Sequence, residues 1–187
     1  PFFDTNVADW TGVNAAIARV TDVVHPDSRA GASMRVTPTG GFSSLDARSS
    51  VSAAGTITPG VAYTSSAWVY SPNGWSDLRS IIDWYDAAGT YLSSGSSTAV
   101  AVPARTWTFL STTNTAPAGA SRCLTRVRSG NTPAAGDTFY VWAAQATPAS
   151  SGSAPQTYTV IRAVNGVAKG HSAGADVRLA TPNYAAL

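Results

Sequence analysis

Residues 63–70 read Tyr-Thr-Ser-Ser-Ala-Trp-Val-Tyr. Successive side chains of a β-strand point to opposite faces of the sheet, and this stretch alternates in that way. Small and β-branched side chains suit the face that packs between two sheets, which leaves Trp68 and Tyr70 on the opposite face. The pattern predicts a half-buried strand with an aromatic outer face. The alternative is that Trp68 belongs to the core.

A second alternating stretch, residues 79–85, reads Arg-Ser-Ile-Ile-Asp-Trp-Tyr. If Trp84 lies in the core, Arg79, Asp83 and Tyr85 share the other face. Such a mixed face is costly to bury unless a ligand or full pairing satisfies its polar groups. We expect the outer faces of both stretches to form one aromatic platform with polar groups at its edge. The predicted platform consists of Trp68, Tyr70, Arg79, Asp83 and Tyr85.

Similar short segments, separated by Gly, Pro, Asn and Ser turns, continue to about residue 145. Further predicted strands cover residues 33–37, 106–112, 123–128 and 137–145. Many short strands divided by turn residues are typical of an all-β sandwich or barrel. We therefore expect a β-sandwich domain over residues 1–145.

The C-terminal part has a different composition. Residues 146–156 consist almost entirely of Ala, Ser, Thr, Pro and Gly, which predicts a linker. Residues 157–187 contain two β-like runs around the tight-turn dipeptide Asn165-Gly166, which predicts a short β-hairpin-like segment. About thirty residues are too few for an independent core, so this segment is expected to pack on another protein or on copies of itself.

Composition excludes several classes of protein. The 187 residues include 12 Lys+Arg and 10 Asp+Glu, and all ten acidic residues are Asp. Lys and Glu commonly cover exposed helix faces, so their near absence argues against an all-helical fold. The net charge of +2 is not concentrated in a basic run, and nucleic acid is not an expected partner. No run approaches the roughly 18 apolar residues of a membrane span, so membrane insertion is not expected.

The six Trp and seven Tyr residues are the strongest functional signal. Sugar rings stack their C–H faces on flat aromatic side chains, and their hydroxyls bind planar polar groups. Trp75 lies in a predicted loop, where it is either a lip of such a binding surface or a plug over one end of the sandwich. Trp10 and Trp107 are predicted core anchors.

Catalytic chemistry has little support in the sequence. Glycoside hydrolysis generally uses two carboxylates, and most Asp residues here lie in turn-like contexts that Asx turns explain. A Ser-His-Asp triad would have to use His25 or His171, each of which is flanked by loop residues. We therefore expect a protein that is not an enzyme.

The single cysteine, Cys123, excludes an internal disulfide and is predicted to be a buried, inert thiol. On the other face of its strand, Arg122, Arg126 and Arg128 contact an acidic partner or form a solvated face. Two histidines cannot hold zinc unaided. Residues 25–31 form a loop that wraps a calcium ion or is a plain turn.

Several motifs follow one another along the chain. They are residues 10–12 (Trp-Thr-Gly), 31–37 (Gly-Ala-Ser-Met-Arg-Val-Thr), 58–64 (Thr-Pro-Gly-Val-Ala-Tyr-Thr), 66–70 (Ser-Ala-Trp-Val-Tyr), 83–92 (Asp-Trp-Tyr-Asp-Ala-Ala-Gly-Thr-Tyr-Leu), 106–108 (Thr-Trp-Thr), 115–120 (Thr-Ala-Pro-Ala-Gly-Ala) and 138–141 (Thr-Phe-Tyr-Val). This series, over about residues 2–145, resembles the carbohydrate-binding modules of families 4 and 9. The resemblance implies a galactose-binding-like jelly roll of two antiparallel sheets. It also implies a concave glycan-binding face, on which Trp68, Tyr70 and Tyr85 match lining positions.

The same resemblance implies a structural calcium ion, but this chain departs from the pattern at one point. After Tyr140-Val141 the family usually has two acidic residues, one of which resembles a calcium ligand. This chain has Trp142 and Ala143 instead. Backbone carbonyls alone seldom hold calcium well, so the departure places the ion in question.

Residues 160–179 resemble a C-terminal segment of tail proteins from phages that infect actinobacteria; its core is Arg-x-Val-Asn-Gly followed by His-x-Ala-Gly-x-x-Val. Together the two resemblances imply a non-catalytic glycan-binding domain of a minor tail protein. It would lie in the extracellular virion, form homo-oligomers, contact other tail proteins and attach to host cell-surface polysaccharide. The alternatives are a purely structural assembly or decoration domain and a depolymerase.

Overall fold

The computed structural model describes residues 7–28, 31–41, 43–131, 133–134 and 136–149. The chain divides into two units, Pro1–Ala154 and Pro155–Leu187, and the described residues all belong to the first. The predicted C-terminal segment at residues 157–187, and most of the predicted linker, lie outside the described residues. No helix within the described part is long and apolar enough to cross a membrane.

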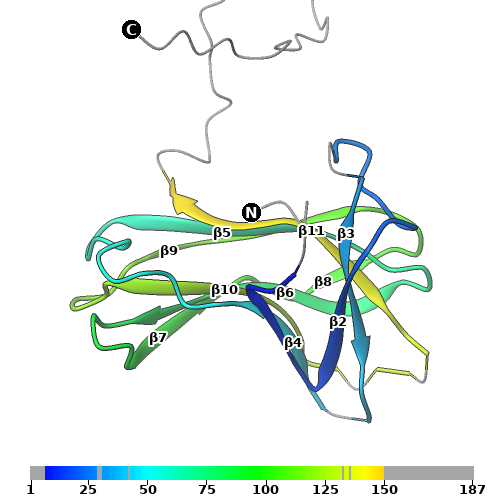
Figure 1. Cartoon of the computed structure of the whole chain (residues 1–187), viewed down its shortest axis with the longest axis horizontal. Helices are drawn as coiled ribbons and strands as arrows, with labels where there is room; N and C mark the ends of the chain where they lie inside the picture. The colour runs from blue at the N-terminus through cyan, green and yellow to red at the C-terminus, as the bar shows by residue number, and fades with distance from the viewer. Residues whose placement is uncertain (1–6, 29–30, 42, 132, 135, 150–187) are drawn as a thin grey trace, which may run out of the picture. The chain divides into compact units, whose positions relative to one another are not determined.

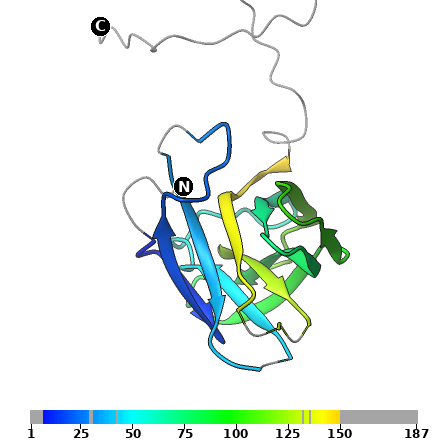
Figure 2. The same ribbon diagram turned by 90° about the vertical axis from the view of Figure 1, so that its right-hand side faces the viewer.

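The described residues form two antiparallel β-sheets, drawn as two layers in Figure 1 and turned by 90° in Figure 2. Sheet A has the strand order β1-β4-β10-β6-β7, with β8 paired to β6, and sheet B has the order β2-β3-β11-β5-β9. The strands of sheet A are β1 (Trp10–Val13), β4 (Leu45–Ser49), β6 (Trp75–Tyr85), β7 (Tyr91–Ser96), β8 (Val100–Val102) and β10 (Arg122–Ser129). Those of sheet B are β2 (Ala15–Val20), β3 (Ser33–Pro38), β5 (Ala62–Tyr70), β9 (Thr108–Thr115) and β11 (Phe139–Pro148). The predicted all-β sandwich is confirmed.

The last strand is longer than the sequence indicated. Residues 146–148, expected to begin the linker, belong to β11 and pair with residues 63–65 of β5. The last strand therefore extends three residues beyond its predicted end at residue 145. Composition was misleading here because backbone hydrogen bonds to β5 hold small residues in the strand, and the side chain of Ala146 packs against a core cluster.

Alternation along β5 and β6 fills the space between the sheets. Ala67 and Val69 are at most 1% exposed and face the core, as does Trp84 of β6 at 2%. Trp10 belongs to the same core, which confirms its predicted role as an anchor. Cys123 is buried as predicted, and burial raises the pKa of its thiol.

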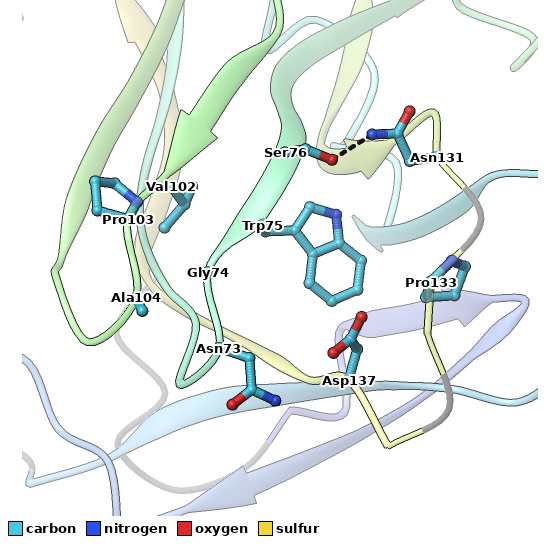
Figure 3. Close-up of a pocket in the computed structure, with 10 residues that line it drawn as sticks. All are labelled: Asn73, Gly74, Trp75, Ser76, Val102, Pro103, Ala104, Asn131, Pro133 and Asp137. Carbon is cyan, nitrogen blue, oxygen red and sulfur yellow. Dashed lines mark hydrogen bonds between the residues drawn. The ribbon is translucent and has the colours of Figure 1, made fainter.

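Trp75 closes one end of the sandwich as the first residue of β6. Its indole is 7% exposed, packs edge-on against Phe139 and donates a hydrogen bond from Nε1 to Oγ of Ser129 at 2.8 Å. The outer side of the ring lines a pocket of about 490 Å³, beside Asn73 and Asp137 (Figure 3). Of the two roles that the sequence left open, the structure favours the plug.

Candidate functional site

The outer face of sheet A carries a band of charged and tyrosine side chains. Leu78, Ser80, Ile82 and Trp84 of β6 face the inside of the sandwich, so the residues that alternate with them face outward. The outward set on β4, β6, β7 and β10 includes Asp46, Arg48, Asp77, Arg79, Ile81, Asp83, Tyr85, Tyr91, Ser94, Ser96, Arg122, Arg126 and Arg128. Three of the predicted platform residues, those on β6, therefore lie on one face.

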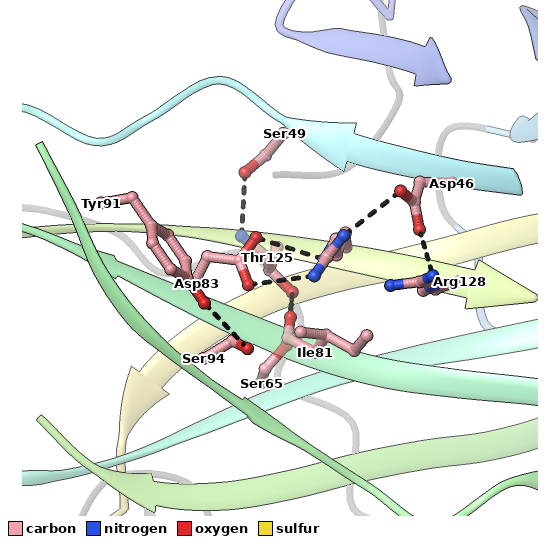
Figure 4. A network of polar contacts seen from close by, with 10 residues as sticks. Asp46, Ser49, Ser65, Ile81, Asp83, Tyr91, Ser94, Thr125 and Arg128 are labelled. Atoms are coloured by element: carbon pink, nitrogen blue, oxygen red, sulfur yellow. Dashed lines mark hydrogen bonds and ion pairs between the residues drawn. The ribbon is translucent and has the colours of Figure 1, made fainter. Parts of the chain in front are cut away.

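Arg126 of β10 joins three strands of this face, and Figure 4 labels the two aspartates that it contacts, Asp46 and Asp83. Nη1 of Arg126 donates a hydrogen bond to Oδ2 of Asp46 on β4 at 3.2 Å, and Nη2 donates to Oδ1 of Asp83 on β6 at 3.3 Å. Nε of Arg126 also lies 3.2 Å from Oδ2 of Asp83. Arg128 approaches Asp46 less closely, with 3.8 Å between its Nε and Oδ1. The three central side chains are fixed before any ligand arrives, because Arg126 is held by both aspartates and each aspartate is held by Arg126.

The network is largely shielded from water. Exposure of the side chains is 16% for Arg126, 8% for Asp83 and 11% for Asp46. Burial raises the pKa of Asp83, and the nearby carboxylate of Asp46 raises it further, while Arg126 acts in the opposite direction. Desolvation is the largest of these effects, so the face carries a carboxylate that the folded chain stabilises incompletely.

Buried hydroxyl groups support the network from inside the sandwich. Oγ of Ser65 on β5 contacts the hydroxyl of Thr125 on β10 and donates to the carbonyl oxygen of Ile81 at 3.2 Å (Figure 4). The same oxygen lies 3.0 Å from Oγ of Ser80. These residues alternate with Asp83 and Arg126 along the same strands. The hydroxyl cluster ties sheet B to the two central strands of sheet A and so fixes the backbone that positions the charged face.

Two tyrosines form the aromatic edge of this face. Tyr85 ends β6 and Tyr91 begins β7, with their ring centroids 5.8 Å apart and the rings at 75°. Tyr91 is 53% exposed, and its hydroxyl donates to Oγ of Ser94 at 3.3 Å. Burial, followed by the charge of Asp83, raises the pKa of Tyr85, so its hydroxyl stays protonated at neutral pH and can donate a hydrogen bond.

A depression of about 360 Å³ lies on the same face, where β6, β7 and β10 run side by side. Its charged lining consists of Asp77, Arg79, Arg126 and Arg128, and Ser94 and Ser96 add hydroxyl groups. Nε of Arg79 donates to Oδ1 of Asp77 at 2.9 Å. The depression therefore offers guanidinium and hydroxyl donors to a polar group of a ligand.

The prediction of a single platform is wrong, because the structure separates its members. Arg79, Asp83 and Tyr85 lie on the outer face of sheet A, whereas Trp68 and Tyr70 belong to β5 in sheet B. Both aromatic side chains do face outward, since Ala67 and Val69 fill the core side of β5. That Trp68 and Tyr70 contact a ligand stays a prediction, and it now concerns a separate surface, the outer face of sheet B.

Trp68 and Tyr70 belong to an aromatic cluster on the outer face of sheet B. Trp68 pairs in register with Phe109 on one side and Trp142 on the other. The ring of His25 stacks on Trp142, with centroids 4.2 Å apart and an angle of 5°. These contacts leave Trp68, Tyr70 and Trp107 half-buried, and Phe109, at 50% exposed, is the most open of the rings in the cluster.

The expectation that Trp107 is a core anchor is wrong. Its ring contacts His25 at 5.2 Å and Tyr70 at 5.4 Å, so it packs on the outer aromatic cluster of sheet B. The alternation of β9 explains this placement. Leu110 faces the core, and Phe109 and Trp107, at odd spacing from it, do not.

The described residues do not fit a calcium ion at the position that the family resemblance implied. His25 and Trp142 stack on each other there, and neither ring offers an oxygen ligand. Asp27 supplies one carboxylate, while Oγ of Ser28 donates to the carbonyl oxygen of Ala32. Residues 29 and 30 of the loop lie outside the described residues. No group of three or more His, Cys, Asp or Glu side chains occurs in the part of the chain that is described.

Sequence reasoning missed Asp46 and Tyr91 as members of the site, and it left open whether Arg126 and Arg128 contact an acidic partner or form a solvated strand face. The alternation of β10 was recognised, and the arginines do face away from Cys123. A signal for their role was present in the complementary charges of β6, which carries aspartates at the same period. What the sequence did not contain was the pairing of β10 with β6 and β4.

No protein family and no curated protein sequence matches this chain. Solved structures do. The C-terminal family 22 carbohydrate-binding module of Clostridium thermocellum Xyn10B has a TM-score of 0.57 and 20% identity over 79% of this chain and 91% of that chain. A family 22 xylan-binding domain from Paenibacillus barcinonensis Xyn10C has a TM-score of 0.56 and 15% identity over 79% and 90%.

The enzymatically active domain of tailspike protein 4 from bacteriophage CBA120 has a TM-score of 0.58 and 14% identity. The match covers 76% of this chain, which spans only 20% of that structure. At these identities the likeness establishes the fold alone. The two modules belong to family 22, so the resemblance to families 4 and 9 stays a prediction.

Proposed function

We propose that this domain is a non-catalytic glycan-binding domain that holds a saccharide against the outer face of sheet A. The observation that carries the proposal is that Tyr85, Tyr91, Asp83 and Arg126 share the outer face of sheet A, on which Arg126 also lines the depression. A tyrosine ring offers a flat apolar surface to the C–H face of a sugar, and fixed charged groups offer hydrogen bonds to its hydroxyls.

Preorganisation supports this use of the face. Arg126 and Asp83 hold each other in place, so binding does not have to immobilise them, which lowers the entropic cost of association. The fold is also compatible, because the similar domain of Paenibacillus barcinonensis Xyn10C is named xylan-binding. For this chain we infer a polysaccharide ligand from the site and not from that name.

The proposed setting is the tail of a phage that infects actinobacteria, with host cell-surface polysaccharide as the partner. The resemblance of residues 160–179 to phage tail segments supports this, and the fold occurs in a phage tailspike. Single aromatic sugar sites are weak, and several copies on one virion would supply avidity. Competition of the purified domain with phage adsorption tests the setting: we expect adsorption to fall, and unchanged adsorption at saturating domain would contradict it.

The binding face is tested by comparing Tyr91→Ala with Phe109→Ala. Both rings are about half exposed, but they lie on opposite sheets, so the second variant is a matched control. We expect Tyr91→Ala to weaken retention on immobilised polysaccharide about tenfold, which corresponds to about 1.4 kcal/mol, and Phe109→Ala to leave it unchanged. Loss in the Phe109 variant alone would move the site to the aromatic cluster of sheet B.

A depolymerase is the enzymatic alternative. It predicts release of reducing ends from host cell wall, and Asp83, with its raised pKa, is the best carboxylate for such chemistry. We expect no release by the wild type. If the wild type releases reducing ends and Asp83→Asn does not, the function is hydrolysis of the glycan and not binding alone.

A structural assembly domain is the second candidate, and the aromatic cluster of sheet B favours it. Half-exposed Phe109 beside Trp68 and Trp107 leaves apolar surface that a neighbouring subunit would bury. This candidate predicts that Phe109→Asp reduces self-association in sedimentation experiments while glycan binding persists.

A further inference from the structure

Two pairs of arginines face each other directly across neighbouring strands of sheet A. Arg79 of β6 lies opposite Arg128 of β10, and Arg126 of β10 lies opposite Arg48 of β4. Like charges placed opposite each other on one face of a sheet are destabilising. Two such pairs side by side require counter-charge, and the aspartates of this face provide only part of it.

The charges of this face do not balance. The outer faces of β4, β6 and β10 carry five arginines and three aspartates, an excess of two positive charges. The arginines are Arg48, Arg79, Arg122, Arg126 and Arg128, and the aspartates are Asp46, Asp77 and Asp83. Within the depression the excess is the same, since three arginines line it and one aspartate does.

The unbalanced guanidinium groups are open to a ligand. Arg79 and Arg128 have side chains that are 42% and 39% exposed, whereas Arg126 between them is held by its two aspartates. The bond from Arg79 to Asp77 uses Nε, and the approach of Arg128 to Asp46 is too long for a hydrogen bond. Within the described part of the chain, the terminal nitrogens of both arginines therefore remain to donate to a third group.

We propose that the depression between Arg79, Arg126 and Arg128 binds an anionic oxygen group carried by the saccharide, so that the ligand is an acidic glycan. This inference rests on the proposed function, because it names the class of ligand for the same face. Guanidinium groups form paired, charge-assisted hydrogen bonds with planar carboxylates and with phosphates. The hydroxyls of Ser94 and Ser96 lie at the same depression and suit neighbouring sugar hydroxyls.

The shared chemistry is an oxyanion attached to a sugar, either the carboxylate of a uronic acid or a phosphodiester of a phosphate-bearing polymer. The test therefore uses three immobilised ligands: a polyuronate, the same polymer after chemical reduction of its carboxyl groups, and a phosphodiester-linked polysaccharide. The reduced polymer is neutral but keeps the sugar rings, so it separates charge recognition from ring stacking. A ladder of salt concentrations accompanies each ligand.

We expect the domain to bind at least one acidic polymer about tenfold or more tightly than the reduced one, since a hydrogen bond to a charged group contributes roughly 1.5–3 kcal/mol. Binding to the acidic polymer should weaken with salt. The polyuronate and phosphodiester arms identify which oxyanion is recognised. Equal binding to the acidic and reduced polymers would overturn the inference and leave the proposed function intact. No binding to any polymer, including neutral ones on a glycan array, would overturn both.

Variants locate the effect. We expect Arg128→Gln and Arg79→Gln each to lower affinity for the acidic polymer about tenfold, with little effect on binding of the reduced one. Arg105→Gln is the matched control, because it removes the same charge from an exposed loop residue outside sheet A. Urea unfolding verifies that each variant is folded. An equal loss in the Arg105 variant would show unspecific attraction to a basic protein and would overturn the site.

Discussion

Replacing Arg126 by Met removes the centre of the charged network while keeping most of the side-chain volume. Two buried carboxylates, Asp46 and Asp83, then lose their shared partner. At 3.2 Å and an effective dielectric constant of about 20, each lost attraction amounts to about 5 kcal/mol before the cost of desolvating the ions is subtracted. Desolvation offsets much of this gain, and breaking one side of a buried pair typically costs about 3–5 kcal/mol.

Arg128→Met is the matched control for this prediction. Its ion pair with Asp46 is longer, at 3.8 Å, and its side chain is 39% exposed. Screening by water reduces such a pair to about 1 kcal/mol or less. We therefore expect the Arg126 variant to lose at least 2 kcal/mol more than the Arg128 variant in the free energy of unfolding.

Urea denaturation followed by tryptophan fluorescence measures both losses. The slope of unfolding free energy against urea should be unchanged, so that the difference arises from the midpoint. Lowering the pH should reduce the cost of Arg126→Met, because Asp83, whose pKa is raised by burial, becomes neutral and no longer needs a cation. If Arg126→Met loses no more unfolding free energy than Arg128→Met, or if its loss persists unchanged in acid, Arg126 does not compensate the charge of buried carboxylates.

Four further predictions concern stability. Burial raises the pKa of Asp83 in the folded state above its ordinary value of 3.8. Between these two pKa values the folded state binds more protons than the unfolded state. The wild type should therefore gain stability relative to Asp83→Asn as the pH falls through this range. For Asp86 the dependence of stability on pH has the opposite sign, because a hydrogen bond from the backbone N–H of Thr90 lowers the pKa of its carboxyl group. The stability advantage of the wild type over Asp86→Asn should therefore shrink in acid. Urea midpoints measured across pH test both signs. Burial lowers the pKa of His25 below 6.5, so stability should fall as pH drops below 6.5, and His25→Gln should flatten that slope; an unchanged slope contradicts the burial of a neutral ring. A Cβ on Gly12 would overlap the backbone oxygen of Ala15, so Gly12→Ala should lower the free energy of unfolding by about 1–3 kcal/mol. At Gly41 a Cβ would meet open space among the described residues, so Gly41→Ala should cost much less in the same assay.

The faces of individual strands could be predicted from the sequence. Period-two alternation placed Trp84 in the core and Trp68 outside it, and both placements are confirmed. Local pattern is sufficient for this purpose, because it reports which side chains are compatible with burial between two sheets. The same pattern also fixed the outward direction of Arg79, Asp83 and Tyr85.

The assignment of strands to sheets could not be predicted in the same way. β5 and β6 follow each other closely in sequence, and consecutive strands are neighbours in a sheet about two-thirds of the time. Here they lie in different sheets, and β6 instead pairs with β10, about forty residues further along the chain. Alternation says nothing about such long-range pairing. This is why the predicted platform mixed residues of two faces and omitted Arg126.

The arrangement of Arg126, Asp46 and Asp83 supports a ligand for sheet A more strongly than the aromatic residues do. A buried ion-pair network usually stabilises a fold no better than apolar side chains of similar volume would. The cluster around His25 on sheet B shows that this chain can cover an outer sheet face with packed rings. Sheet A instead keeps charges that are partly desolvated, opposed arginines and an aspartate with a raised pKa. Packing alone does not require that choice, whereas recognition of a polar ligand does, because a ligand can supply the hydrogen bonds and the negative charge that the folded chain leaves unmatched.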